Sequence, residues 1–151
     1  MKNKIKIIAL DLEGTLISSE STRIPRPGLF EFLTWCYSNF ERVVIFTAVR
    51  EKTVREIANE LINLKQVPKR FRNIEYIIWE GDEKDLNFIP NVHPTEVIIV
   101  DDYEYLIKPM QKTQWVGIKC FDPLLNIKEG EFQIIDNELE RVKNKLKDLI
   151  N

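Results

Sequence analysis

Short apolar runs alternate along this chain with longer segments in which apolar residues recur every three or four positions. Five runs of β-branched and apolar residues predict strands, at residues 5–10, 43–46, 74–79, 97–100 and 115–118. The three- and four-residue spacing predicts amphipathic helices over residues 29–40, 54–62 and 139–149. Strands that are apolar on both faces and alternate with helices are typical of an α/β fold, in which helices cover both faces of a mostly parallel sheet.

Two predicted helices carry specific signals at their ends. Pro27 is expected in the first turn of the first helix, where its missing N–H costs nothing. Asn137 and Glu140 have the spacing of a capping box, which predicts a closing amphipathic helix over about residues 137–150. A length of 151 residues fits a single domain that spans residues 1–151.

Composition narrows the functional classes. The chain has 22 basic and 24 acidic residues, and this near-neutral balance argues against general nucleic-acid binding, which needs a concentrated positive field. Only two cysteines are present, so the pattern favours a reducing cytoplasm over a secreted disulfide scaffold. No window approaches 18 apolar residues, so no membrane-spanning segment is expected.

Candidate site residues follow four of the predicted strands. They are Asp11, Glu13 and Thr15 after the first, Thr47 and Ala48 after the second, Lys84 beyond the third, and Asp101 and Asp102 after the fourth. Ligands of open parallel sheets bind at the carboxyl ends of the strands, so we expect these residues to share one rim.

Such a set of residues suits phosphoryl transfer. Clustered carboxylates repel one another, and hard oxygen ligands favour Mg²⁺, which prefers one or two carboxylates together with a substrate phosphate. A lysine and a hydroxyl can hold the remaining phosphate oxygens. A carboxylate in line with phosphorus can then act as the nucleophile and form an aspartyl-phosphate.

The same residues resemble the motifs of the haloacid dehalogenase superfamily of phosphohydrolases. Its first motif is D-x-D-x-T, and residues 11–15 read DLEGT, with Glu13 at the second acidic position. Its second motif is matched by Thr47, its third by Lys84 and its fourth by Asp101 and Asp102. Within that superfamily the chain is most similar to the FCP/SCP-like (NLI-interacting-factor-like) phosphatases. That similarity rests on RPGLFEFL at residues 26–33, FTA at 46–48, KDL at 84–86 and VDD at 100–102, and it covers about residues 4–122.

The resemblance implies a role for each matched residue. Asp11 is expected to be the nucleophile and a metal ligand, and Glu13 the general acid/base, with its backbone carbonyl on the metal. Thr47, Ala48 and Lys84 are expected to bind the phosphoryl group. Asp102 is expected to ligate Mg²⁺ with its side chain, and Asp101 is expected to bind the ion directly or through water. The resemblance also implies a three-layer α/β/α core, a five-stranded parallel sheet of order 5-4-1-2-3, and no cap domain.

Two departures from the family pattern stand out. Tyr103 follows the acidic pair where the family often has Ser-Pro, which affects the local loop more than the chemistry. Glu13 stands where the family nearly always has Asp. The extra methylene moves the carboxyl by about 1.5 Å, and a misplacement of about 1 Å can cost on the order of 10²-fold in rate.

Several functions therefore remain open. We predict a slow but active Mg²⁺-dependent phosphatase. The alternatives are a catalytically silent phosphate-binding module and phosphoryl transfer to an acceptor other than water. A rim without a cap suits a phosphorylated macromolecule, and the resemblance points to phosphoserine or phosphothreonine in proteins, with a small phosphate ester as the other substrate class.

Overall fold

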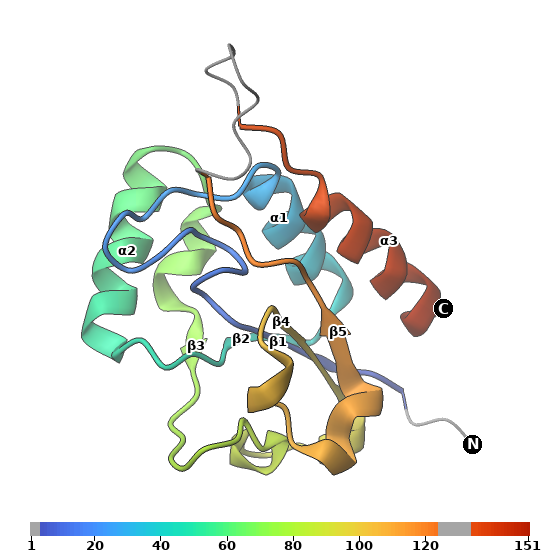
Figure 1. Cartoon of the computed structure of the whole chain (residues 1–151). Helices are drawn as coiled ribbons and strands as arrows, with labels where there is room; N and C mark the ends of the chain where they lie inside the picture. Colours follow the sequence, from blue (N-terminus) through green and yellow to red (C-terminus); the bar gives the residue numbers. More distant parts are fainter. Residues whose placement is uncertain (1–3, 124–133) are drawn as a thin grey trace.

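The computed structural model describes residues 4–123 and 134–151. Five parallel strands form one sheet of order β3-β2-β1-β4-β5 (Figure 1). The strands are β1 (Ile7–Leu10), β2 (Arg42–Ile45), β3 (Glu75–Tyr76), β4 (Val97–Asp101) and β5 (Trp115–Gly117). The predicted order, 5-4-1-2-3, is this order in reverse, so the predicted topology is confirmed.

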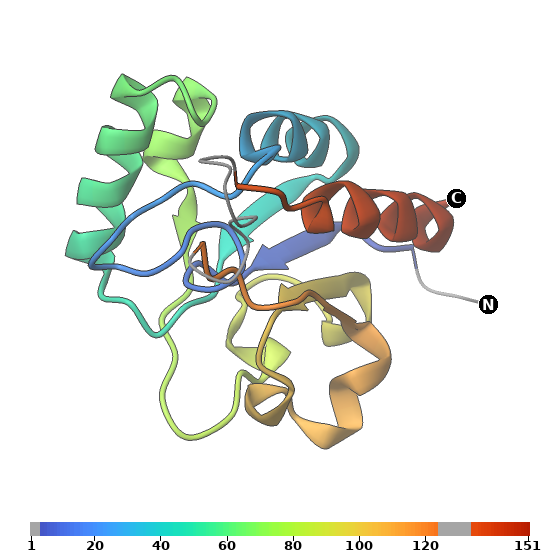
Figure 2. The same ribbon diagram turned by 45° about the horizontal axis from the view of Figure 1, so that its top comes forward.

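Helices cover both faces of the sheet, but they differ in kind. The three α-helices α1 (Leu29–Asn39), α2 (Glu51–Asn63) and α3 (Glu138–Ile150) lie on one face (Figure 2). Short 3-10 helices lie against the other face: η2 (Leu86–Phe88), η3 (Pro94–Glu96), η4 (Glu104–Leu106) and η5 (Pro109–Gln114). A further one, η1 (Lys69–Asn73), precedes β3. Runs this short carry no clear periodicity, so the sequence pattern did not predict them.

Burial on both faces explains the apolar composition of the central strands. In β1, Ile8 and Leu10 belong to the core beneath the α-helices, while Ile7 and Ala9 belong to the core beneath the 3-10 helices. All four are at most 1% exposed. Successive side chains of a strand point to opposite faces, so a strand with two buried faces is apolar throughout.

The third predicted strand is shorter than expected. Only Glu75 and Tyr76 pair with β2, although the apolar run continues to Trp79. The reason is that β3 lies at the sheet edge and its one neighbour ends at Ile45, so the backbone beyond Ile77 has no strand beside it. Ile78 is consequently 81% exposed.

Both predictions about helix ends were wrong. α1 begins at Leu29 after Gly28, whose φ of 83° lies in the left-handed region, so Pro27 precedes the helix. The side chain of Asn137 makes no capping hydrogen bond at α3. The amide of Glu138 instead donates to Asp136 Oδ1 at 3.1 Å.

Strand register brings the carboxyl ends of β1, β2 and β4 to one edge of the sheet. Leu10 is paired with both Ile45 and Val100. The amide of Asp11 donates to the Val100 carbonyl at 3.0 Å, and that of Phe46 donates to the Leu10 carbonyl at 2.8 Å. The residues that follow these strands therefore leave the sheet side by side.

The edge stays uncovered in the part of the chain that is described. The segment from Thr15 to Pro27 is a short loop, and the segment from Thr47 to Lys84 holds only α2, η1 and β3. Neither contains a cap domain. Among residues 4–123 and 134–151, no helix has the length and apolar character needed to cross a bilayer.

Candidate active site

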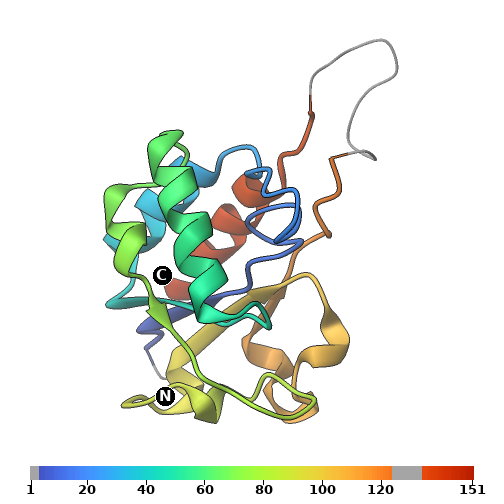
Figure 3. The same ribbon diagram turned by 90° about the vertical axis from the view of Figure 1, so that its left-hand side faces the viewer.

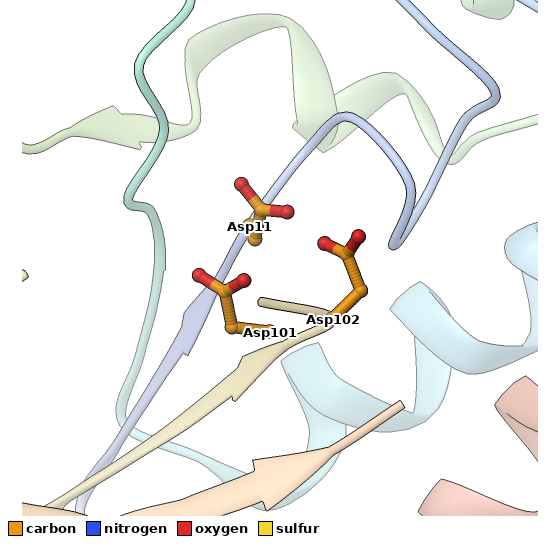
Figure 4. A group of neighbouring side chains, drawn as sticks. All are labelled: Asp11, Asp101 and Asp102. Atoms are coloured by element: carbon orange, nitrogen blue, oxygen red, sulfur yellow. The ribbon is translucent and has the colours of Figure 1, made fainter. Parts of the chain in front are cut away.

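Three carboxylates meet at this edge of the sheet. Asp11 follows β1, Asp101 is the last residue of β4, and Asp102 comes directly after it. Figure 4 shows the three side chains turned toward one another from these two strand ends. One oxygen of each lies within 4.8 Å of one oxygen of the other two.

The loop after Asp11 holds two of these acids in place. Thr15 is fully buried, and its hydroxyl lies 2.9 Å from Asp11 Oδ2 and 3.2 Å from Asp102 Oδ1, so it can donate to either. Gly14 has a φ of 74°, which favours glycine. A Cβ at Gly14 would come within 2.5 Å of Asp102 Oδ2, so glycine is also needed for space.

Lys84 supplies the positive charge of the cluster. Its Nζ donates to Asp11 Oδ1 at 2.9 Å and to Asp101 Oδ2 at 2.5 Å, and its side chain is 1% exposed. The backbone fixes this position because the Lys84 amide donates to the Leu106 carbonyl at 2.6 Å. Figure 3 shows the loop after β3 running past the segments that follow β4, where this bond forms.

Asp85 anchors the same loop from the other side. Lys108 Nζ and Gln111 Nε2 both donate to its carboxylate at 2.9 Å, as does the amide of Asn87. Burial acts to raise the pKa of Asp85, but these donors outweigh it and hold the pKa well below its usual range. Asp85 therefore stays ionised and links the Lys84 loop to η5.

Burial strongly perturbs the acids themselves. It raises the pKa of Asp11 to about 7, against the opposing effect of Lys84. It raises the pKa of Asp101 to about 6, with the charge of Asp11 adding to the effect. Burial acts to lower the pKa of Lys84, but the two carboxylates outweigh it and raise that pKa. Lys84 therefore keeps its positive charge at neutral pH.

The donor set fits a divalent cation. Three carboxylates against one ammonium leave two negative charges without a partner when all the acids are ionised. Carboxylate oxygens are the ligands preferred by hard divalent ions. Lys84 donates to Asp11 and Asp101, so Asp102 is the acid of the three whose charge Lys84 does not offset directly.

The expected phosphate-binding residues lie at the end of β2. Thr47 is buried, and its Oγ1 accepts a hydrogen bond from the Val49 amide at 3.1 Å. Ala48 is exposed on the rim. Trp79 Nε1 donates to the Thr47 carbonyl at 2.8 Å, which ties the loop after β3 to this turn.

Glu13 lies apart from the carboxylate cluster. It is half-buried, and its Oε2 accepts a hydrogen bond from the Glu20 amide at 2.6 Å. The three-acid group within the described residues does not include its side chain. Glu13 thus hydrogen-bonds to the loop of residues 18–26.

Sequence reasoning missed a buried arginine beneath the site. All five N–H donors of Arg26 are used, at distances between 2.7 and 3.2 Å. Two bonds go to the Gly14 and Thr15 carbonyls, one to the Lys119 carbonyl and two to the Asp136 carboxylate. Arg26 thereby joins the loop after β1 to the segment before α3. A pattern of apolar periodicity gives no signal for such a contact.

The two cysteines lie in different surroundings. Both are free, with Cys36 buried in α1 and Cys120 exposed beside Asp102. Burial, and then the charge of Asp102, raise the pKa of Cys120, so its thiol stays protonated near neutral pH.

Comparison with known proteins gives a family and a fold for this chain. No curated protein matches the sequence. Among solved structures, a variant of the fission yeast RNA polymerase II CTD phosphatase Fcp1 bound to beryllium fluoride is similar, with a TM-score of 0.58 and 14% sequence identity. The match covers 97% of this chain and 50% of that one, so this chain spans about half the length of Fcp1 and shares its fold.

The family model of the NLI interacting factor-like phosphatases matches residues 6–150. The chain therefore belongs to the NLI interacting factor-like phosphatase family, within the haloacid dehalogenase superfamily.

Proposed function

We propose that the chain hydrolyses phosphate monoesters in the presence of Mg²⁺, through an aspartyl-phosphate on Asp11. The observation that carries this proposal is the position of Asp11, one of whose oxygens accepts from Lys84 while the other lies within hydrogen-bond distance of the Thr15 hydroxyl. A carboxylate held at both oxygens keeps one orientation, which favours attack along one line.

The first half-reaction forms the covalent enzyme. An oxygen of Asp11 attacks phosphorus, and the bond from phosphorus to the leaving oxygen breaks. Glu13 supplies a proton to that oxygen, so the product leaves as an alcohol. Thr47, the Ala48 amide and Lys84 hold the other phosphoryl oxygens as negative charge develops.

The second half-reaction restores the carboxylate. Glu13 takes a proton from water, the water oxygen bonds to phosphorus, and the bond from phosphorus to Asp11 breaks to release phosphate. Asp11, Asp102, the Glu13 carbonyl and, directly or through water, Asp101 would hold Mg²⁺. The ion supplies charge neutralisation for the phosphoryl oxygens.

The uncovered rim supports a large substrate. A site without a cap in the described residues leaves room for a phosphorylated serine or threonine within a protein chain. The name of Fcp1, a CTD phosphatase, points in the same direction. A phosphoprotein is therefore the proposed substrate class.

Phosphate release from para-nitrophenyl phosphate tests the reaction. The native protein should require Mg²⁺, lose activity with chelator, and regain it when Mg²⁺ is restored. Asp11→Asn should abolish turnover, while Asp148→Asn, an exposed change on α3, should keep the native rate. Equal rates for the native protein and Asp11→Asn would refute the proposal.

A second candidate function is a silent phosphate-binding module. The observation that favours it is the hydrogen bond from the Glu20 amide to Glu13, which occupies one oxygen of the expected acid/base. Glu13→Asp separates the two functions. A large gain over a near-zero native rate would assign the native chain to binding, whereas a change of less than about tenfold would leave Glu13 as a working acid/base.

A further inference from the structure

A small cavity opens directly beside the Thr47 turn. It has a volume of about 280 Å³, and its lining includes Thr47, Ala48, Tyr76, Ile78, Trp79 and Glu80; we call it the side pocket. Pockets for whole small-molecule ligands have volumes of about 300–1,000 Å³. The side pocket lies at the lower end of this range and has room for one side chain adjacent to the reacting group.

Hydrogen bonds hold the aromatic walls of the side pocket. The Tyr76 hydroxyl donates to the Val49 carbonyl at 2.6 Å, and Trp79 Nε1 donates to the Thr47 carbonyl at 2.8 Å. The Trp79 ring also packs against Phe46, with ring centroids 5.5 Å apart. Since both donors bind to carbonyls of the turn that carries Thr47, the side pocket keeps a fixed position relative to the expected phosphoryl group.

Glu80 is the charged residue among those that line the side pocket. Glu80, Asp82 and Glu83 are exposed in the loop that follows β3. No lysine or arginine lies between residues 73 and 83. Beyond this loop, Lys84 is bound to Asp11 and Asp101, and Lys108 to Asp85. Glu80 would repel a second phosphate or a carboxylate in the side pocket and attract a cation.

The same surfaces suit a cation on an aliphatic stem. An ammonium or guanidinium group is attracted to a tryptophan face and to a carboxylate, here Trp79 and Glu80. The stem of a lysine or arginine packs well on exposed apolar surface, which Ile78 provides at 81% exposure. We propose that the side pocket binds a lysine or arginine side chain that neighbours the phosphorylated residue of a peptide. This inference rests on the proposed function, because it takes the phosphoryl group to lie at Thr47.

Binding of phosphopeptides to Asp11→Asn protein tests the side pocket without turnover. Three fluorescent phosphoserine peptides would differ only in the residues on both sides of the phosphoserine, which are arginine, alanine or glutamate. An exposed ion pair and a cation–π contact contribute a factor of about 2–5 each in affinity. The arginine peptide should therefore bind about 5–30-fold more tightly than the glutamate peptide, with the alanine peptide between them.

A matched pair of variants assigns the preference to Glu80. Glu80→Gln should reduce the arginine-to-glutamate ratio to about 2–5, because only the cation–π contribution remains. Glu140→Gln, an exposed change on α3, should keep the native ratio. Equal affinities for the three peptides, or an unchanged ratio in Glu80→Gln, would overturn the inference.

Nucleotides provide the competing outcome. If adenosine or uridine monophosphate bound more tightly than the arginine peptide, and Trp79→Leu removed that preference, the side pocket would hold a base and the inference would be wrong. Failure of the proposed function gives a different result, namely no Asp11-dependent phosphate release from para-nitrophenyl phosphate by the native protein.

Discussion

The buried pair of Arg26 and Asp136 makes a quantitative prediction about stability. The side chains are 0% and 5% exposed, and two hydrogen bonds of 2.9 and 3.0 Å join them. Asp136→Asn removes the negative charge with little change of shape and leaves the guanidinium without its counter-charge. Removing one partner of a buried ion pair typically costs about 3–5 kcal/mol of unfolding free energy.

The lower end of that range is expected here. Arg26 keeps its bonds to the carbonyls of Gly14, Thr15 and Lys119, which continue to solvate the charge. We therefore predict a loss of about 3 kcal/mol. At about 2–4 °C per kcal/mol for a chain of this size, the melting temperature should fall by about 6–12 °C.

Urea denaturation at pH 7 measures this loss. Tryptophan fluorescence and far-ultraviolet circular dichroism should give coincident transitions, which justifies a two-state free energy. Asp148→Asn, an exposed change on α3, is the control and should stay within about 0.5 kcal/mol of the native protein. If Asp136→Asn also stayed within that margin, the ion pair between Arg26 and Asp136 would not stabilise the fold, and the reasoning would be refuted.

Two further changes test the acid cluster. Burial raises the pKa of Asp101 to about 6 from 3.8, so the folded state binds the Asp101 proton more tightly than the unfolded state does. The protonated carboxyl therefore stabilises the fold at low pH, and this stabilisation is lost as pH rises from about 4 through 6. With chelator present, Asp101→Asn should therefore become more stable relative to the native protein as pH rises from 4 to 8, by on the order of 3 kcal/mol in urea denaturation. A difference in unfolding free energy that does not change with pH would contradict this. Gly14→Ala and Gly28→Ala should each lose about 1–2 kcal/mol because φ is positive at both. Only Gly14→Ala should also lose phosphatase activity, since its Cβ displaces Asp102, and equal activities of the two variants would count against that contact.

Local patterns in the sequence predicted the main elements because the central strands are buried on both faces. β1 and β4 appear as unbroken apolar runs, and their order on the sheet follows from the family resemblance. The end of β3 could not be predicted from apolar residues alone, because pairing there depends on where β2 stops. The predicted capping residue of α3 was also wrong, because the side chain of Asp136 rather than that of Asn137 accepts from the Glu138 amide.

The candidate site was predictable where it depends on strand ends. Asp11, Asp101 and Asp102 are neighbours, and Lys84 joins two of them, as expected from their places after the strands. The ion pair between Arg26 and Asp136 was not predictable, because the two residues lie 110 positions apart in the sequence and no local pattern links them. The catalytic roles, the Mg²⁺ requirement and a cytoplasmic location stay predictions.

Detection of a phosphoryl group on Asp11 tests the central claim most directly. A slow phosphoserine peptide would be mixed with the Mg²⁺-loaded native protein, quenched in acid within one turnover and digested for mass spectrometry. The account predicts a gain of one phosphoryl group on the peptide that contains Asp11, lost on treatment with hydroxylamine and absent from Asp11→Asn. Steady turnover with no such adduct, or an adduct on another residue, would contradict it.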